Sequence, residues 1–216
     1  YGATVVEIVK NTFSHSAARN IGAENAHEEY ILFTVHDALP PSLTWLHHMF
    51  SFLKQEHLSA VSCRERPRID ADLFSRVENW YHYKEILHLE NRDTVLSQPR
   101  EQKPDTLRAS AQLSNVACLI PRDVFLRYKF RGTYAEDLEL GLRLIADGER
   151  LGIMNSPGVI HSHTRLSYDY LRRGFIDKFT IEQLLREPPG AEAAHPDLGH
   201  FIRDILITND ILNRMG

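Results

Sequence analysis

The sequence has little cysteine, no long apolar run and no large excess of charge. Its 216 residues include only two cysteines, Cys63 and Cys118, and both lie in apolar segments, "SAVSC" and "NVACLIP". Two such residues do not make a disulfide framework, and we expect reduced thiols in the core of a cytoplasmic protein. No apolar run approaches the roughly 20 residues of a membrane span, and the first residues do not have the pattern of a signal peptide.

The sequence also lacks the short motifs of several large enzyme classes. It contains no Walker loop, no GxSxG elbow, no HExxH and no CxxC. Its net charge of −4 gives no electrostatic reason to bind nucleic acid, so we expect no such partner. The hydrophobic fraction of 43% and the charged fraction of 25% are those of an ordinary globular protein.

Strand and helix patterns alternate at the start of the chain. Apolar runs rich in β-branched residues predict strands at residues 4–9, 30–35 and 58–63. Between them, the helical spacing of apolar residues predicts one helix at 16–27 and another that begins at Pro41. This β-α-β-α-β order predicts an α/β protein with a mostly parallel sheet flanked by helices.

The rest of the chain is predicted to be richer in helix. Residues 91–112 are polar and contain two prolines, which favours a long surface loop. A buried strand is predicted at 115–121 and a helix with an acidic first turn at 135–148. The other predicted elements are helices at 68–90, 122–128, 167–186 and 196–214, and short strands at 150–154 and 158–161.

Polar residues stand where two of the predicted strands end. His36 and Asp37 follow one strand, and His161 and His163 stand at the end of another. Ligands of open α/β sheets bind beyond the carboxyl ends of the strands, and alternate residues of an extended segment point the same way. Both imidazoles can therefore face one site, where a pair of histidines suits a borderline divalent metal, and Asp37 offers an oxygen ligand at its own strand end. The alternatives are that Asp37 only makes a turn before Pro40 and that the histidines are core residues.

Acidic residues open the helix predicted at 135–148, namely Glu136, Asp137 and Glu139. A carboxylate at this position is favoured by the helix dipole and can simply be a cap. It can also be a general base held on a rigid element and directed into a cleft. Three acids in four positions exceed what a cap requires.

Taken in order, these segments resemble the family-2 glycosyltransferases, which have the Rossmann-like GT-A fold. The resemblance rests on "HSAARNIGAENAHEEYILFTVHDALPPSLTWL", "NVACLIPRDVF" and "AEDLELGLRLIADGERLGIMNSPGVIHSH", and it covers about residues 5–178. The branch that looks most similar is the rhamnosyltransferase-like enzymes of bacterial surface polysaccharide synthesis. The resemblance implies a hexosyl or rhamnosyl transferase with a nucleotide-sugar donor and a glycan or lipid-linked glycan acceptor.

The resemblance also implies a metal site. The family's Asp-x-Asp motif holds a divalent metal on the nucleotide diphosphate, and the matching triplet here is Val35-His36-Asp37. The first aspartate is missing, so Asp37 is expected to bind Mg²⁺ or Mn²⁺ with His163 or His161 completing the site. The loss of one carboxylate leaves the metal dependence open.

Further roles follow from the same resemblance. Glu136 and Asp137 match the family's acidic pair, in which the second residue is the catalytic base of an inverting transfer. Arg19 and Asn20 match the "arN" segment, which lies near the nucleotide. On the helix after "HSH", Arg172 or Arg173 is expected to reach the diphosphate, unless both face only solvent.

Family members begin with a β-α-β unit that grips the nucleobase, and this sequence starts after the position of that unit. The chain is therefore either a fragment of an ordinary transferase or a protein without its base-binding half. We divide it into a GT-A-like domain, residues 1–186, and a C-terminal helical extension, residues 187–216. The last helix is a candidate contact between subunits, and peripheral association with the inner face of the membrane stays open.

Two rival functions also stay open. The first is a catalytically inactive GT-A-like binding module; the weakened metal motif and the missing unit favour it, whereas the intact "ED" and "HSH" argue against it. The second is a metal-dependent hydrolase that uses Asp37, His161 and His163. Such a hydrolase would release phosphate or sugar with no acceptor present.

Overall fold

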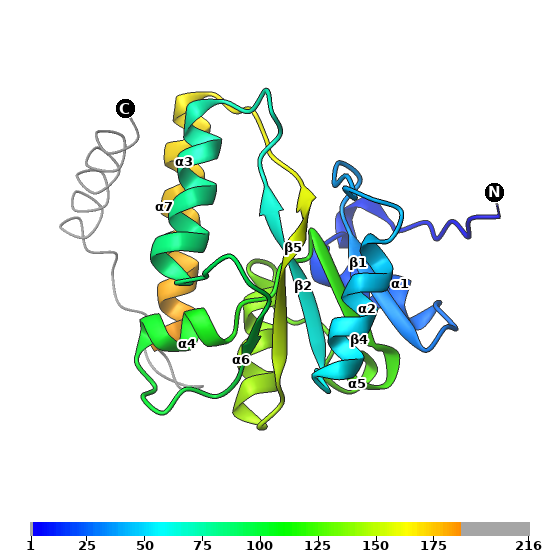
Figure 1. The fold of residues 1–216 in the computed structure, drawn as a ribbon. Coiled ribbons are helices and arrows are strands. Elements are labelled where there is room, and N and C mark those ends of the chain that lie inside the picture. Colours follow the sequence, from blue (N-terminus) through cyan, green and yellow to red (C-terminus); the bar gives the residue numbers. More distant parts are fainter. Residues whose placement is uncertain (1, 187–216) are drawn as a thin grey trace.

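One five-stranded sheet runs through the centre of the molecule, with helices on both of its faces (Figure 1). The computed structural model describes residues 2–186. The strands are β1 (Tyr30–Thr34), β2 (Ala60–Arg66), β3 (Thr94–Leu96), β4 (Ala117–Pro121) and β5 (Leu151–Ile160). The helices are η1 (Lys10–Thr12), α1 (His15–Glu24), α2 (Trp45–Gln55), α3 (Leu73–Tyr81), the π-helical turn η2 (His82–Ile86), α4 (Pro104–Ser110), α5 (Arg122–Tyr128), α6 (Glu136–Ala146) and α7 (Ser167–Arg186). The predicted α/β class is confirmed.

The sheet is mixed rather than mostly parallel. Its strand order is β1-β4-β2-β5-β3. β4 pairs antiparallel with both β1 and β2, β3 pairs antiparallel with β5, and β2 and β5 are parallel. β1, β2 and β5 therefore run in one direction and β3 and β4 in the other. The prediction of a mostly parallel sheet was wrong because β4, which comes late in the chain, inserts between β1 and β2 and runs antiparallel to both.

The central strand β4 shows why its segment is apolar throughout. Successive side chains of a strand point to opposite faces of the sheet. Cys118 and Ile120 pack into the core under α1, α5 and α6, whereas Ala117 and Leu119 pack into the core under α2. Both faces are covered, so all four side chains are buried.

The two cores differ in composition. The core under α1, α5 and α6 contains the rings of Phe33, Phe125 and Phe130, whose centroids lie 4.7 to 5.0 Å apart. The core under α2 is built around Met49 and Trp45. Both cysteines are buried and free, as predicted, and burial raises the pKa of each thiol above its usual range.

Several predicted boundaries need correction. Residues 4–9 form no strand but an exposed segment without regular structure, with Val5 82% exposed. Residues 91–112 are not one long loop, because they include β3 and α4. The two short strands predicted at 150–154 and 158–161 are one strand, β5, whose pairing with β2 shifts register between Cys63 and Glu65.

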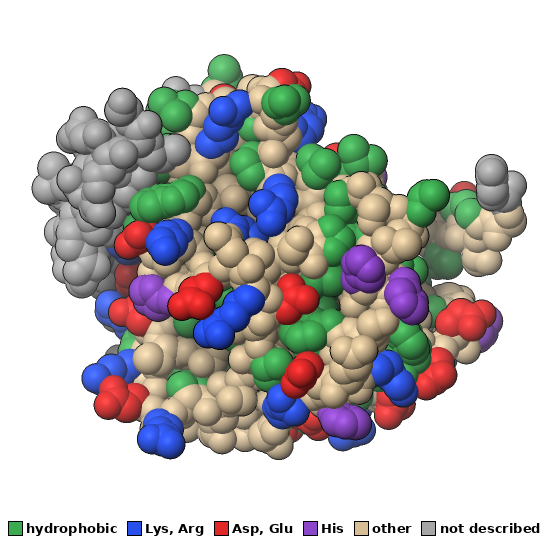
Figure 2. All heavy atoms as spheres, viewed as in Figure 1, with side chains coloured by type: hydrophobic (Ala, Val, Ile, Leu, Met, Phe, Trp, Pro, Cys, Tyr) green, Lys and Arg blue, Asp and Glu red, His purple; other side chains and the backbone are tan. Residues whose placement is uncertain are grey.

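The end of the chain was predicted to form a helical extension, and residues 187–216 lie outside the described residues. The last described helix, α7, lies beside α3 (Figure 1). In the described part of the chain, no helix is both long and apolar enough to cross a membrane. The face drawn in Figure 2 carries acidic and basic side chains intermixed.

Candidate functional site

One edge of the sheet gathers the polar residues that the sequence singled out. β1, β2 and β5 all end at this edge, and the antiparallel strand β4 begins there. Asp37 follows β1, His161 and His163 follow β5, and Asn115 precedes β4. The mixed direction of the strands therefore brings these three separate chain segments to one place.

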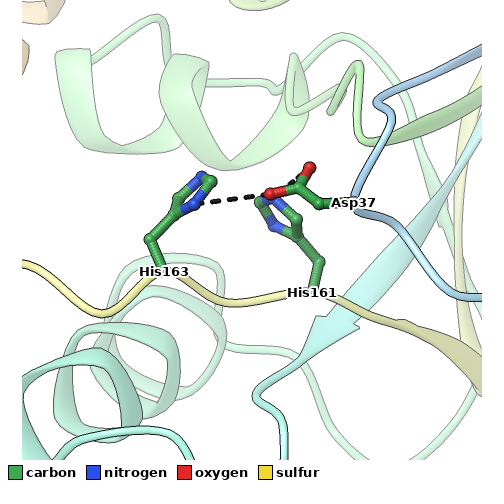
Figure 3. A group of neighbouring side chains, drawn as sticks. All are labelled: Asp37, His161 and His163. Atoms are coloured by element: carbon green, nitrogen blue, oxygen red, sulfur yellow. Dashed lines mark ion pairs between the residues drawn. The ribbon is translucent and has the colours of Figure 1, made fainter.

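Asp37, His161 and His163 point toward one another (Figure 3). His161 Nε2 lies 3.5 Å from one Asp37 oxygen, and His163 Nδ1 lies 3.5 Å from the other. The two imidazole rings stand nearly perpendicular, with centroids 4.7 Å apart. The side chain of His161 is 10% exposed and that of His163 is 41% exposed, so the group opens to solvent on one side.

Backbone hydrogen bonds fix the two segments that carry this group. Leu39 N–H donates to Ile160 O at 2.9 Å, and Ile160 N–H donates to Leu39 O at 3.0 Å. His161 N–H donates to Arg66 O at 2.9 Å, which continues the pairing of β5 with β2. The turn after β1 is closed by the Ala38 N–H and Val35 O, so Asp37 is not needed as the turn acceptor.

The group fits a divalent cation. A carboxylate and two imidazoles suit ions such as Mn²⁺ and other first-row metals. Bonds of about 2.1 Å place neighbouring ligand atoms about 3 to 3.5 Å apart, and one ligand atom from each of the three residues lies within 4.8 Å of the others. Partial burial, and then Arg165, lower the pKa of His163, which favours its neutral, ligating form. His36 is exposed and lies outside this group.

The second cluster is at the N-terminus of α6. Glu136 is buried and accepts hydrogen bonds from Arg19 Nη1 at 2.6 Å and from Asn115 Nδ2 at 3.1 Å. Asp137 accepts from the backbone N–H of Asn115 at 3.2 Å and from that of Leu138 at 2.9 Å. The predicted acidic pair is thus divided: Glu136 is neutralised by a guanidinium, and Asp137 is held by backbone amides.

Asp137 has a perturbed pKa. Burial, and then the neighbouring charge of Glu136, raise the pKa of its carboxyl to about 6, against the lowering effect of the backbone amides. A general base works best with a pKa near the pH of the reaction. Ala135, which precedes the pair, has φ of +50°, an uncommon conformation for a residue with a side chain. Such strain next to a carboxylate with a raised pKa is typical of a functional site.

The third acid of this turn, Glu139, has a different task. It forms a two-pronged ion pair with Arg143 one turn later, with both contacts at 2.7 Å. Arg143 also donates to the carbonyls of Tyr128 and Lys129, at the end of α5. Glu139 therefore helps to fix α6 against α5. This structural role explains why the first turn of α6 has a third acid besides Glu136 and Asp137.

The two residues predicted near the nucleotide both connect α1 to this cluster. Arg19 forms the ion pair with Glu136, and both side chains are largely buried. Asn20 donates to Phe130 O and accepts from Phe130 N–H, each at 3.0 Å. Ser16 adds a hydrogen bond to Gly132 O at 2.6 Å. α1 thus holds the loop that leads into α6, and a role in nucleotide binding stays a prediction.

The arginines after "HSH" differ in position. Arg173 pairs with Asp177 at 3.7 Å, and it is the smallest of several contributions to the pKa of His163, which burial and then Arg165 lower most. Arg172 instead lies on an exposed face of α7, beside Leu171 and Phe175. Arg165, which the sequence analysis did not single out, follows burial as the second cause of the lowered pKa of His163, whereas the hydrogen bond to Glu65 raises the pKa of His161. The place of Arg165 two residues after His163 was the available signal.

Three further residues were missed. Glu65 bonds His161, Ser114 bonds Glu65, and Asn115 bonds Glu136 and Asp137. Asn115 lies at the start of a strand, whereas the sequence argument looked only beyond strand ends. Its buried Oδ1 has no hydrogen-bond partner within the described structure, which is unusual for an amide.

Comparison with known proteins places the fold. The chain is similar to the mannosyltransferase PcManGT from Pyrobaculum calidifontis, whose structure is in complex with GDP-Man and Mn²⁺, with a TM-score of 0.54 and 18% identity over 83% of this chain and 45% of that one. It is also similar to residues 1–349 of TarS from S. aureus in complex with UDP-GlcNAc, with a TM-score of 0.51 and 11% identity over 83% of this chain and 49% of that one.

At these identities the likeness is one of fold, and it confirms the predicted glycosyltransferase architecture. The chain spans about half the length of each of these proteins. No family model and no curated protein sequence matches it.

Proposed function

We propose that this chain carries the metal-binding and catalytic residues of an inverting glycosyltransferase of surface polysaccharide synthesis. The donor is a nucleotide-sugar with a hexosyl or rhamnosyl group, and the acceptor is a glycan or a lipid-linked glycan. The observation that carries the proposal is a carboxylate with a raised pKa and a cation-type group of ligands at the same sheet edge. The similarity of fold to two glycosyltransferases supports it.

Asp37, His161 and His163 are the residues that would hold the cation, Mg²⁺ or Mn²⁺. When bound, such an ion supplies positive charge against the diphosphate leaving group. Two imidazoles take the place of the carboxylate that is missing from the Asp-x-Asp pattern. They favour Mn²⁺ over Mg²⁺, because imidazole suits transition metals and Mg²⁺ prefers oxygen ligands.

Asp137 would be the general base. It takes the proton from an acceptor hydroxyl while that oxygen forms a bond to the anomeric carbon from the face opposite the nucleotide. The bond from the anomeric carbon to the diphosphate oxygen breaks, and its electron pair leaves with the nucleoside diphosphate. The pKa of about 6 supports this role, because the carboxylate is ionised at neutral pH yet more basic than an ordinary aspartate.

Arg165, two residues after His163, and Arg173, on α7, would face the diphosphate. We retain Arg172 as a weaker candidate, because it lies on the exposed face of α7. Arg19 and Asn20 would act near the nucleotide mainly by holding the loop before α6. The proposal includes a cytoplasmic location at the inner face of the membrane, where lipid-linked acceptors reside.

The test is a transfer assay with UDP-, dTDP- and GDP-sugars and Mn²⁺. A panel of saccharides on lipid-like aglycones serves as acceptors, and mass spectrometry detects the product. Asp137→Asn should lower the transfer rate by at least about 1,000-fold, because it removes the only proposed proton acceptor. Asp123→Asn is the matched control, since Asp123 is an exposed acid in the first turn of α5.

The outcome also separates the rival functions. Equal product formation by Asp137→Asn and the wild-type chain would refute the assignment of the base. Release of sugar at the same rate with and without acceptor would favour the metal-dependent hydrolase. Absence of both nucleotide binding and transfer would favour an inactive binding module.

A further inference from the structure

Glu65 is a charged side chain that lies between the two clusters and has no part in the reaction described above. It stands near the end of β2, and its side chain is 23% exposed. One carboxylate oxygen lies 2.8 Å from His161 Nδ1. The other accepts a hydrogen bond from Ser114 Oγ at 2.8 Å. Both oxygens thus have a partner, and each partner belongs to a different segment of the site.

The backbone around Glu65 is fixed as firmly as its side chain. Its N–H donates to the hydroxyl of buried Tyr83 at 2.8 Å, and its carbonyl accepts from Asn79 Nδ2 at 3.0 Å. The register shift between Cys63 and Glu65 sets Glu65 opposite Val159, two residues before His161. Irregularities of this kind redirect side chains and are common beside active sites. β2 therefore presents this carboxylate to His161 from a rigid position.

The contact determines which nitrogen of His161 is available. A carboxylate can only accept at Nδ1, so the proton of the neutral imidazole is held there and the lone pair stays on Nε2. Nε2 is the atom that faces Asp37, at 3.5 Å. Histidine ligands of metals are commonly oriented in this way by a carboxylate on the other ring nitrogen.

We propose that Glu65 is a positioning residue that holds His161 as the Nδ1-protonated tautomer for a divalent cation bound by Asp37, His161 and His163. This inference rests on the proposed function. The inference adds to the proposed function a residue that supports the cation site without contacting the cation. The same carboxylate reaches Ser114, so it also fixes the segment next to the proposed base.

That second contact continues to α6. Ser114 is followed by Asn115, whose backbone N–H bonds Asp137 and whose side-chain amide bonds Glu136. A single line of hydrogen bonds therefore runs from His161 through Glu65 and Ser114 to the segment that holds Asp137. The cation group and the base are set by one shared support rather than independently.

The first experiment measures cation affinity without any donor or acceptor. Mn²⁺ is titrated into the full chain by calorimetry, for the wild type, Glu65→Gln, Glu65→Ala and Asp37→Asn. We expect Glu65→Gln to weaken Mn²⁺ binding by about 10-fold and Glu65→Ala by about 10- to 100-fold. Asp37→Asn, which removes a ligand, should weaken it more. Glu56→Gln is the control, because Glu56 is a half-exposed carboxylate paired with Arg150.

The second experiment reads the tautomer directly in the metal-free chain. Nitrogen-15 chemical shifts of the His161 ring at pH 8.5 should show a proton on Nδ1 in the wild type. In Glu65→Ala the Nε2-protonated form should dominate, as it does in free histidine. A residue that only stabilises the fold would change the melting temperature without changing the tautomer.

Each outcome decides a different question. Wild-type affinity in both Glu65 variants, or an Nε2 proton in the wild type, would overturn the role of Glu65 and leave the proposed function standing. Failure of the wild type to bind Mn²⁺ would overturn this role together with the cation site. The transfer assay with Asp137→Asn tests the transferase itself separately.

Discussion

The packing of α6 against the end of α4 allows a stringent test of the structure. Gly141 lies inside α6, and a Cβ built there would stand 1.8 Å from the backbone oxygen of Ala111. Real Cβ atoms essentially never approach another heavy atom closer than 3.0 Å. Ala111 is fully buried, and its N–H is bonded to Leu107 O. Gly141→Ala therefore requires the backbone at Ala111 to move by about 1.2 Å or more.

The expected loss of stability follows from two opposing effects. Overpacking a core typically costs about 1 to 3 kcal/mol, and a clash with a buried backbone oxygen belongs at the upper end. Alanine in place of glycine in a helix interior recovers about 1 kcal/mol. We expect Gly141→Ala to lower the free energy of unfolding by about 2 kcal/mol, which corresponds to about 4 to 8 °C in melting temperature for a domain of this size.

Gly22→Ala is the matched control, because Gly22 lies in α1 and a Cβ there would meet nothing within 4 Å. This variant should gain about 0.5 to 1 kcal/mol. Urea unfolding followed by circular dichroism at 222 nm measures both variants under the same conditions. Equal stability of the two variants would refute the close packing of α6 on Ala111. Because Ala111 leads directly to Ser114 and Asn115, Gly141→Ala should also lower transfer activity.

Two further predictions concern the pKa of Asp137. Transfer requires the ionised carboxylate of Asp137, so the transfer rate should fall about tenfold per pH unit below about pH 6. Glu136→Gln removes a neighbouring charge and should move this decline to lower pH. A decline of the wild-type rate centred near pH 4 would contradict the raised pKa. The raised pKa also means that Asp137 favours the folded state below about pH 4 and that this contribution is lost as the pH rises through 6. Asp137→Asn should therefore gain about 1 to 2 kcal/mol of stability at pH 8 relative to the wild type and none at pH 4. The gain at pH 8 includes a deduction, because an asparagine amide oxygen accepts hydrogen bonds from the backbone amides less strongly than a carboxylate does. Urea unfolding at the two pH values measures the difference in free energy of unfolding between the variant and the wild type. The same difference at both pH values would show that ionisation of the Asp137 carboxyl is not its cause.

The sequence drew attention to the three candidate ligands because they follow apolar strands, and the resemblance to the family-2 glycosyltransferases joined Asp37 to the two histidines. Asp37 and His161 each follow an apolar strand, and strands that run in the same direction end at one edge of a sheet. The spacing of His161 and His163 also predicted that both rings face one side. These are local properties, which a single chain segment displays by itself. The roles assigned to these residues remain predictions.

The sequence could not predict how β4 enters the sheet. An apolar run at residues 115–121 indicates a buried strand but does not say between which neighbours it lies or in which direction it runs. β3 was missed because it has only three residues, and α4 because it is short and mostly polar; tertiary contacts rather than local preference stabilise both. Glu65 was missed for the same reason, since only the fold brings it to His161.

The unexpected direction of β4 has a consequence for chemistry. Had β4 run parallel to β1 and β2, its start would lie at the opposite edge of the sheet. Asn115 would then be separated from the N-terminus of α6 by the length of the strand. Because β4 is antiparallel, Ser114 and Asn115 lie between Glu65 and Asp137. The partly buried Asp137 costs stability at neutral pH, and this segment supplies an amide that offsets part of that cost. The strand that the local pattern could not orient is thus the one that joins the proposed base to the proposed cation site.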